Sequence, residues 1–320
     1  MCLAPVRHVT GTCLARAWHR LGASGKNLPM RATLIVNPYA SSVTEERVRA
    51  VERELGPAYE LTTLLTERRN HAVELSRGAD GDAIFAFGGD GVFNEVLNGA
   101  DGARPLGFVP GGGTNILPRS LGLPRDAVAA ARRLTVARPR RISLGRANGR
   151  RFAFAAGIGL DSQSVRRVEA MGRGEDGRRP GDLAFVCAIV GVVAANGWRL
   201  PDVLELKGSG RGALIVVANS AVFTYAGAIP FRFCPETRFE LGLDYAALPS
   251  PGALRIARGF LRAARGRGLA DLPGALSGHD VDRIEVACDR PLPLQADGED
   301  LGDVDEVVFE CERDAVSVLA

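Results

Sequence analysis

The chain has 320 residues, 46% hydrophobic and 24% charged, a composition typical of a globular protein and a length that favours two domains. The net charge of +3 gives no support to nucleic-acid binding. Six cysteines without a Cys-x-x-Cys pair argue against a zinc site or a disulfide framework, so reduced thiols and a cytoplasmic location are expected. Lys26 and Lys207 are the only lysines, and the absence of a Gly-x-x-x-x-Gly-Lys motif excludes a P-loop.

Residues 1–29 differ from the rest of the chain. They contain several basic residues but no long apolar run, which makes a secretory signal a poor fit. Met30 stands just before the apolar run 33–36, which has the character of a first strand. We therefore expect Met30 to be the natural start and residues 1–29 to be a disordered or misassigned extension.

Short apolar runs alternate with helical patterns over residues 30–138. Such alternation favours a parallel sheet covered by helices on both faces. In chain order the patterns predict a strand at 33–36, a helix at 44–55 capped by Thr44, a strand at 60–66, a helix at 70–77, a strand at 83–87, a helix beginning at 94, a strand at 106–109 and a helix at 126–134.

The pattern changes after residue 138. Short apolar or alternating runs, separated by turn residues, predict an antiparallel sandwich or barrel-like domain over 139–312, and residues 313–320 are a candidate to complete the first domain. The expected strands are 140–147, 151–156, 203–206, 213–218, 239–245, 283–287 and 307–311, and the expected helices are 182–196 and 252–267.

Two glycine-rich turns are the most informative feature of the sequence. The first, Gly88-Gly89-Asp90-Gly91, follows the apolar run 83–87, and the second, Pro110-Gly111-Gly112-Gly113-Thr114-Asn115, follows 106–109. Glycine permits sharp turns and leaves no Cβ between backbone N–H groups and a phosphate. Each turn leads into a segment that can be helical, so the pair predicts a polyphosphate site, and hence a nucleotide. The first turn alone also fits an ordinary strand–helix connection capped by Asp90.

The continuation of the first turn, Phe-Asn-Glu-Val-Leu-Asn-Gly at 93–99, resembles the signature of the diacylglycerol kinase catalytic domain, whose superfamily includes sphingosine, ceramide and bacterial lipid kinases. The second turn is similar to the second nucleotide loop of that family. Further matches follow in the family's order: Asn37-Pro38, Thr66-Glu67-Arg68 with His71, Ala156–Asp161, Tyr225-Ala226-Gly227 and Asp297-Gly298-Glu299. The resemblance covers residues 31 to 320. By itself, Gly157-x-Gly159 with Asp161 lacks the spacing of a dinucleotide-binding motif and is interpreted as a turn of the second domain.

The resemblance implies a fold and a reaction. The fold is an N-terminal three-layer α/β domain like that of NAD kinases and phosphofructokinases, over 30–138, followed by a mainly antiparallel β-sandwich domain over 139–312. The reaction is transfer of the γ-phosphate of ATP, with Mg²⁺, to the hydroxyl of diacylglycerol or a related lipid. The residues that would face the nucleotide are Asn37, Thr66, Gly88, Gly89, Asp90, Gly91, Gly113, Thr114 and Asn115.

Three acidic residues would carry the chemistry that the resemblance implies. Asp297 would be the general base for the lipid hydroxyl, with Glu299 beside it in the metal and phosphate network. Asp90, Asp297 and Glu299 are candidate Mg²⁺ ligands, directly or through water. Local sequence alone favours an ordinary turn at 297–299, and only the family order makes Asp297 a catalytic candidate.

Two positions depart from the family pattern. Val92 stands where the family has threonine, which removes a hydroxyl worth about 1 kcal/mol of hydrogen bonding. Bacterial relatives have an acidic turn that builds a second, structural Mg²⁺ site. The matching stretch here has Glu240 followed by Leu241, so Glu240 is the acidic candidate ligand that remains.

Two helices bear on contact with a membrane. The helix 252–267 carries Arg255, Arg258, Arg262 and Arg265 at spacings of three and four, which predicts a basic face for anionic phospholipids or an ordinary solvated face. The apolar helix 182–196 is too short to span a bilayer and is expected to be buried or to line an acyl pocket. We thus expect peripheral membrane association with a lipid substrate, no nucleic-acid partner, and a homodimer formed through exposed strand edges.

Two other functions fit parts of the sequence. A NAD-kinase-like enzyme shares Gly-Gly-Asp-Gly but not the continuation at 94–99. A nucleotide- or lipid-binding regulator with impaired catalysis would account for Val92 and Leu241, whereas the intact Asp90, Asp297 and Glu299 argue for an enzyme.

Overall fold

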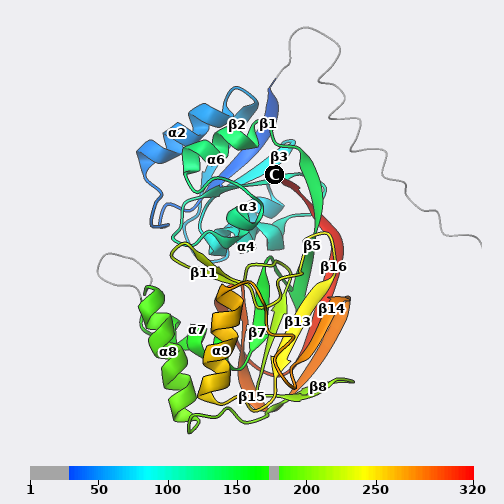
Figure 1. The fold of residues 1–320 in the computed structure, drawn as a ribbon. Coiled ribbons are helices and arrows are strands. Elements are labelled where there is room, and N and C mark those ends of the chain that lie inside the picture. The colour runs from blue at the N-terminus through cyan, green and yellow to red at the C-terminus, as the bar shows by residue number, and fades with distance from the viewer. Residues whose placement is uncertain (1–28, 173–179) are drawn as a thin grey trace, which may run out of the picture.

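The computed structural model describes residues 29–172 and 180–320, and the expectation for the N-terminal extension falls almost wholly outside these ranges. The predicted fold class is confirmed: an α/β part comes first and a strand-rich part follows (Figure 1). The domain limits at residues 138 and 312 stay a prediction.

Four parallel strands form the sheet of the α/β part, in the order β4-β3-β1-β2. Helices α2 and α6 cover one face and α3 and α4 cover the other (Figure 1). The elements are β1 (Met30–Val36), α2 (Glu45–Leu55), β2 (Tyr59–Leu65), α3 (His71–Arg77), β3 (Ala83–Gly88), α4 (Asp90–Gly99), β4 (Leu106–Pro110), α5 (Ile116–Ser120) and α6 (Ala127–Leu134). Thr44 caps α2 as predicted, since its side chain accepts a hydrogen bond from the backbone N–H of Arg47 at 3.3 Å.

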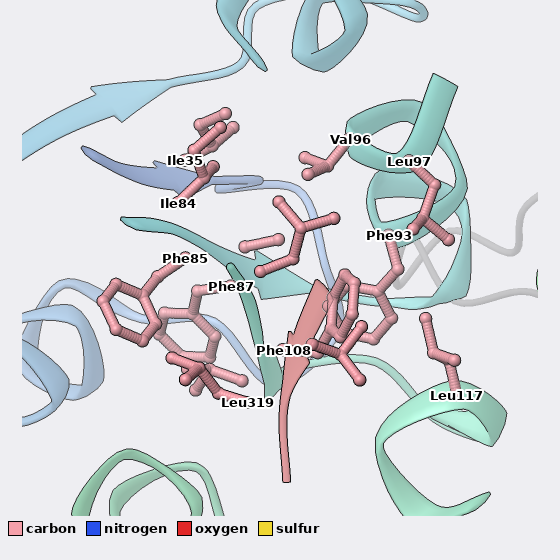
Figure 2. Close-up of a cluster of buried hydrophobic side chains, with 14 of the residues drawn as sticks. Ile35, Ile84, Phe85, Phe87, Phe93, Val96, Leu97, Phe108, Leu117 and Leu319 are labelled. Atoms are coloured by element: carbon pink, nitrogen blue, oxygen red, sulfur yellow. The ribbon is translucent and has the colours of Figure 1, made fainter. Parts of the chain in front are cut away.

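The core of the α/β part fixes α4 against the sheet. Figure 2 shows Phe93, Val96 and Leu97 of α4 turned toward the strands. All three are buried, and the rings of Phe93 and Phe108 meet edge to face with centroids 5.3 Å apart. Because β3 is buried along its whole length, apolar residues on both of its faces hold the following turn in place.

The C-terminal part contains antiparallel strand pairs and three helices in the described ranges. Its strands are β5 (Pro139–Ala147), β6 (Arg150–Phe152), β7 (Ala155–Ile158), β8 (Leu204–Leu206), β9 (Gly210–Gly212), β10 (Leu214–Ala218), β11 (Thr224–Ala226), β12 (Ile229–Phe231), β13 (Leu243–Leu248), β14 (Leu276–Val281), β15 (Arg283–Ala296) and β16 (Glu299–Leu319). Its helices are α7 (Leu160–Ala170), α8 (Asp182–Ala195) and α9 (Ala253–Ala264).

The last strand, β16, connects the two parts. It pairs with β15 and β5 in antiparallel fashion, and its Val318 pairs in parallel with Leu106 of β4. Leu319 joins the core beside Phe85 and Phe87 (Figure 2). A single hydrogen-bonded path therefore runs from β14 to β2 through both parts.

Several elements differ from the sequence prediction. The helix expected from residue 94 begins at Asp90, so the first glycine turn itself opens the helix. Helix α7 was not predicted, because glycines at 157 and 159 were interpreted as a turn. Helix α8 is not a buried helix: Leu183 is 76% exposed. Among the described helices, none has the length and apolar character needed to cross a membrane.

Candidate active site

The sequence-predicted nucleotide residues meet at one edge of the parallel sheet. Asn37 follows β1, Thr66 follows β2, Gly88 ends β3 and Gly111 follows β4. Backbone hydrogen bonds tie these ends together: Asn37 N–H donates to the Phe87 carbonyl at 2.9 Å, and Thr66 N–H to the Val36 carbonyl at 2.8 Å. The carboxyl ends of parallel strands are the common ligand position in α/β proteins.

The two glycine turns pack backbone against backbone. Gly111 N–H donates to the Gly88 carbonyl at 2.6 Å. A Cβ on Gly112 would lie 2.7 Å from the Cα of Gly89, whereas a Cβ on Gly113 would meet nothing within 4 Å. The sequence therefore needs glycine at 112 to let the turns touch, and Gly113 leaves open space at an exposed position.

Asn115 shapes the second turn. Its backbone has a left-handed φ of 50°, and its side-chain amide closes the turn by accepting from Gly112 N–H at 2.9 Å and donating to the Gly112 carbonyl at 2.7 Å. Asparagine tolerates this conformation and bonds locally to the backbone. The neighbouring Thr114 carbonyl accepts from Arg119, whose guanidinium lies over the Tyr225 ring at 3.1 Å from its centroid.

The amino end of α4 points its backbone N–H groups toward this edge. Gly89 at the cap position has no side chain to bind them, and the partial positive charge of a helix N-terminus favours an anion. Asp90 accepts a hydrogen bond from Leu117 N–H at 3.2 Å, which links the first turn to the helix after the second. Val92 is buried against Gly88, so this residue fills space where a threonine hydroxyl would stand.

Asp297 is held by four hydrogen bonds at the centre of the site. Its carboxylate accepts from the backbone N–H groups of Ala153 at 2.6 Å, Phe154 at 2.9 Å and Ala155 at 3.2 Å, and from Asn94 Nδ2 at 2.8 Å. The side chain is 5% exposed and the backbone is left-handed, with φ 50°. Burial raises the pKa of Asp297 to about 6, although the four donors favour the charged form.

Glu299 lies over the first glycine turn. Its Oε2 contacts Arg150 at 3.1 Å and Arg69 at 3.4 Å, and its Oε1 would be 3.1 Å from a Cβ on Gly91. The turn between β15 and β16 is thereby brought to the amino end of α4. Sequence reasoning missed both arginines, because Arg69 and Arg150 lie 230 and 149 residues from Glu299 in the chain.

The remaining polar residues of the 93–99 motif have structural partners. Glu95 accepts from the N–H groups of Asn70 at 2.9 Å and Ala72 at 3.0 Å, so it caps the start of α3. Asn98 donates to the Arg151 carbonyl at 3.0 Å and accepts from the Arg151 N–H at 3.0 Å. The motif thus fixes α4 between α3 and β6.

A second buried carboxylate supports the 297–299 turn through a glutamine. Asp161, at the start of α7, accepts from Gln295 Nε2 at 2.9 Å, and Gln295 Oε1 accepts from Gly298 N–H at 3.0 Å. Burial raises the pKa of Asp161 to about 6. The sequence interpretation of this residue as part of a plain turn missed its indirect contact with the 297–299 turn.

The predicted metal ligands do not form a ready-made cage. Within the described ranges, no group of three or more His, Cys, Asp or Glu side chains could hold a metal ion. Asp297 is already bound by four donors, and Glu299 by two arginines. Glu240 instead pairs with Arg140 at 3.4 Å. The residues therefore do not fit a Mg²⁺ site built by the protein alone.

The basic face predicted for 252–267 keeps only two of its four arginines, because the other two bond to neighbouring loops. Arg255 donates to the carbonyls of Pro249 and Pro273, and Arg262 donates to the Gly268 carbonyl and pairs with Asp271. Only Arg258 and Arg265 of the four are exposed.

A hollow of about 330 Å³ adjoins this edge between α2 and the ends of β1 and β2. Its apolar lining is Val36, Pro38, Val43, Val48 and Leu65, and its charged lining is Glu45, Arg49 and Glu52.

Residues 31–147 match the sequence model of the diacylglycerol kinase catalytic domain, which confirms the resemblance over this segment. The chain is 36% identical over 140 residues to a diacylglycerol kinase of Bacillus subtilis (strain 168), covering 40% of this chain and 46% of the relative. It is 38% identical over 111 residues to a diacylglycerol kinase of Staphylococcus haemolyticus, covering 33% and 34%. The chain thus spans about half or less of the length of these curated relatives.

The whole fold has a match among solved structures. A diacylglycerol kinase structure from Bacillus anthracis str. Sterne superposes with a TM-score of 0.64 at 20% identity, over 92% of this chain and 98% of that one. At this identity the likeness establishes the fold of both parts.

Proposed function

We propose that this protein is a lipid kinase that transfers the γ-phosphate of ATP to a hydroxyl of diacylglycerol or a related lipid. The observation that carries the proposal is the meeting of two glycine turns, a helix amino end and the Asp297 turn at one edge of a parallel sheet. Phosphoryl transfer depends chiefly on positioning and charge neutralisation, and this edge supplies donors for both. The match of 31–147 to the diacylglycerol kinase domain favours this function over a NAD-kinase-like enzyme.

Backbone N–H groups and arginines would bind the nucleotide. In this proposal Gly88, Gly89 and Gly91 admit the phosphates to the amino end of α4, and Gly113, Thr114 and Asn115 close the other side. Asn37 and Thr66 directly follow Val36 and Leu65, which line the hollow beside β1 and β2, and we assign this hollow to the adenine base. Arg69 and Arg150 both contact Glu299 beside the first glycine turn. Because the chain has only two lysines, these arginines would supply the positive charge that neutralises the phosphates.

Asp297 would act as the general base. A pKa of about 6 keeps it ionised at neutral pH while it can still accept a proton. Its lone pairs are occupied, so an incoming hydroxyl must replace one donor. Three of the donors are backbone N–H groups and the fourth is the side-chain amide of Asn94, which also donates to the Arg151 carbonyl at 3.0 Å. We therefore infer that the lipid hydroxyl replaces the Asn94 amide as a hydrogen-bond donor to Asp297.

Magnesium would accompany ATP as part of the substrate. Mg²⁺ commonly keeps several waters and uses one or two carboxylates plus substrate phosphates, and Asp90 and Glu299 are the candidates here. A bound Mg²⁺ would neutralise phosphate charge.

The test is transfer of radiolabelled γ-phosphate from ATP-Mg²⁺ into a bacterial lipid extract. Wild-type protein should label a lipid, whose mobility identifies the acceptor class, and Asp297→Asn should not. Asp289→Asn is the matched control, because this exposed carboxylate pairs with Arg211 instead of the site. Nucleotide binding without labelled lipid would instead favour a regulator with impaired catalysis.

A further inference from the structure

Helix α8 has an unusual surface. The stretch 183–195 contains no charged residue, yet Leu183, Val186 and Val190 are 76%, 55% and 49% exposed. Their spacing of three and four places them on one face. On the other side of the helix Ala188 and Val192 are buried, and Val192 and Val193 belong to a core cluster. A helix that is apolar all round is normally buried or in contact with lipid.

Helix α9 extends this surface. The Trp198 carbonyl accepts from Ala253 N–H at 3.0 Å, which joins the segment after α8 to the start of α9, and residues of both helices belong to one core cluster. Figure 1 shows both helices on the same side of the C-terminal part. Trp198 is 57% exposed, and Leu254 and Leu261 on α9 are 74% and 51% exposed. Within the described ranges, large apolar side chains of two neighbouring helices are therefore open to solvent.

Asp182 begins α8, but every charged residue within 183–195 and α9 is an arginine. Arg258 and Arg265 are exposed on α9 at the same helical spacing as Leu254 and Leu261, and neither forms an ion pair in the described part of the chain. Neither 183–195 nor α9 contains an aspartate or glutamate. Apolar side chains beside arginines complement an anionic bilayer, where aliphatic groups enter the acyl boundary and guanidinium groups stay among the headgroups.

We propose that the exposed faces of α8 and α9, with Trp198 between them, form the surface that inserts into an anionic lipid bilayer. The choice of a bilayer over a second protein rests on the proposed lipid-kinase function and on this charge pattern. Helix α8 is 14 residues long and its inner face is buried, so it lies in the interface and does not span it.

Vesicle binding tests the surface directly. Leu183→Ser/Val186→Ser/Val190→Ser should lower co-sedimentation with phosphatidylglycerol-containing vesicles by about tenfold or more, because three apolar side chains leave the acyl boundary. Val136→Ser is the matched control, since Val136 is 70% exposed on the α/β part and should leave binding unchanged. Arg258→Ser/Arg265→Ser should remove the preference for phosphatidylglycerol over phosphatidylcholine.

Tryptophan fluorescence measures insertion of the surface into the bilayer independently of kinase activity. The sequence has two tryptophans, so a Trp18→Phe background leaves Trp198 as reporter. Its emission should shift to the blue on vesicle binding and be quenched by brominated acyl chains. Unchanged emission with bound vesicles would overturn the proposal.

Further experiments distinguish a bilayer surface from a dimer interface, and the bilayer surface from the proposed kinase function. Unchanged co-sedimentation of the triple variant would refute the docking surface, and so would conversion of a wild-type dimer to a monomer by the same substitutions. Phosphorylation of dioctanoylglycerol supplied without vesicles reads the proposed function separately. If the wild type phosphorylates this acceptor and the docking tests fail, the kinase stands and the bilayer surface falls.

Discussion

Replacing Asp297 by asparagine separates its proposed catalytic role from its structural one. The carboxylate accepts four hydrogen bonds, two on each oxygen. An asparagine can accept on one oxygen only, so its NH₂ group must face two donors in either orientation. Leaving two buried donors unpaired costs roughly 2 to 6 kcal/mol of folding free energy.

The same change also removes an ionisation cost. Because burial raises the pKa of Asp297 from 3.8 to about 6, keeping it charged above pH 7 costs the folded state about 3 kcal/mol. A raised folded pKa means that a bound proton stabilises the fold, so wild-type protein loses this contribution as pH rises from about 4 to about 6. The net cost of the substitution at pH 7.5 is then at most about 3 kcal/mol. It should be larger at pH 4 by about 2 to 3 kcal/mol.

The activity should respond differently from the stability. Loss of a general base should lower kcat by about 10²- to 10⁴-fold with little change in KM for ATP. Initial rates of phosphate transfer and urea unfolding at pH 4 and 7.5 measure the two effects on one preparation, beside Asp289→Asn. If Asp297→Asn kept more than about a tenth of wild-type kcat, Asp297 would not be the base.

The pH profile gives a companion test. Wild-type kcat/KM should fall on the acid side below pH about 6, following the pKa of Asp297. Asn94→Ala removes a donor to the charged carboxylate, so the acid limb should move to higher pH. An acid limb that stays in place would show that the titrating group is not Asp297.

The remaining predictions concern binding and stability. Gly112→Ala should weaken ATP binding by about tenfold or more in a calorimetric titration, because its Cβ would clash with the Cα of Gly89. Gly113→Ala should weaken ATP binding clearly less, because its Cβ would meet no atom within 4 Å. Equal losses of affinity would contradict the packing argument. Glu312 pairs with the largely buried Arg151 at 2.6 Å, and the bond to this guanidinium lowers the pKa of Glu312. The ion pair therefore stabilises the folded protein above the unfolded pKa of Glu312, and this stabilisation is lost as pH falls through the folded pKa. Glu312→Gln should lower the free energy of unfolding by about 1 to 3 kcal/mol at pH 7 and by little at pH 3. A loss of stability that does not depend on pH would refute this assignment.

Local signals were enough to predict the α/β part. The β-branched run before Asn37, the cap at Thr44 and both glycine turns each depend on neighbouring residues, and the structure places them close to their predicted positions. The failures come where local signals conflict with packing. Gly159 adopts φ 105° directly before α7, so the glycine that indicated a turn is the residue that opens a helix.

The surface of α8 could not be predicted from its composition. An apolar run of this length predicts a helix with apolar faces. It does not predict how many of those faces the rest of the chain covers. The burial depends on which elements pack beside it, and those lie far away in sequence. The same limit hid the use of Arg255 and Arg262, whose partners are loop carbonyls revealed only by the fold.

The centre of the site shows why motif residues can be recognised before their roles. Asn94 and Asp297 are 203 residues apart, and each belongs to a short segment that is ordinary by itself. Their contact requires β16 to carry the 297–299 turn back to α4 while its far end completes the core beside β4. A substitution that loosens β16 should therefore disturb the 297–299 turn as well as the fold. For that reason the urea and rate measurements must be made on the same variants before any loss of activity is assigned to chemistry.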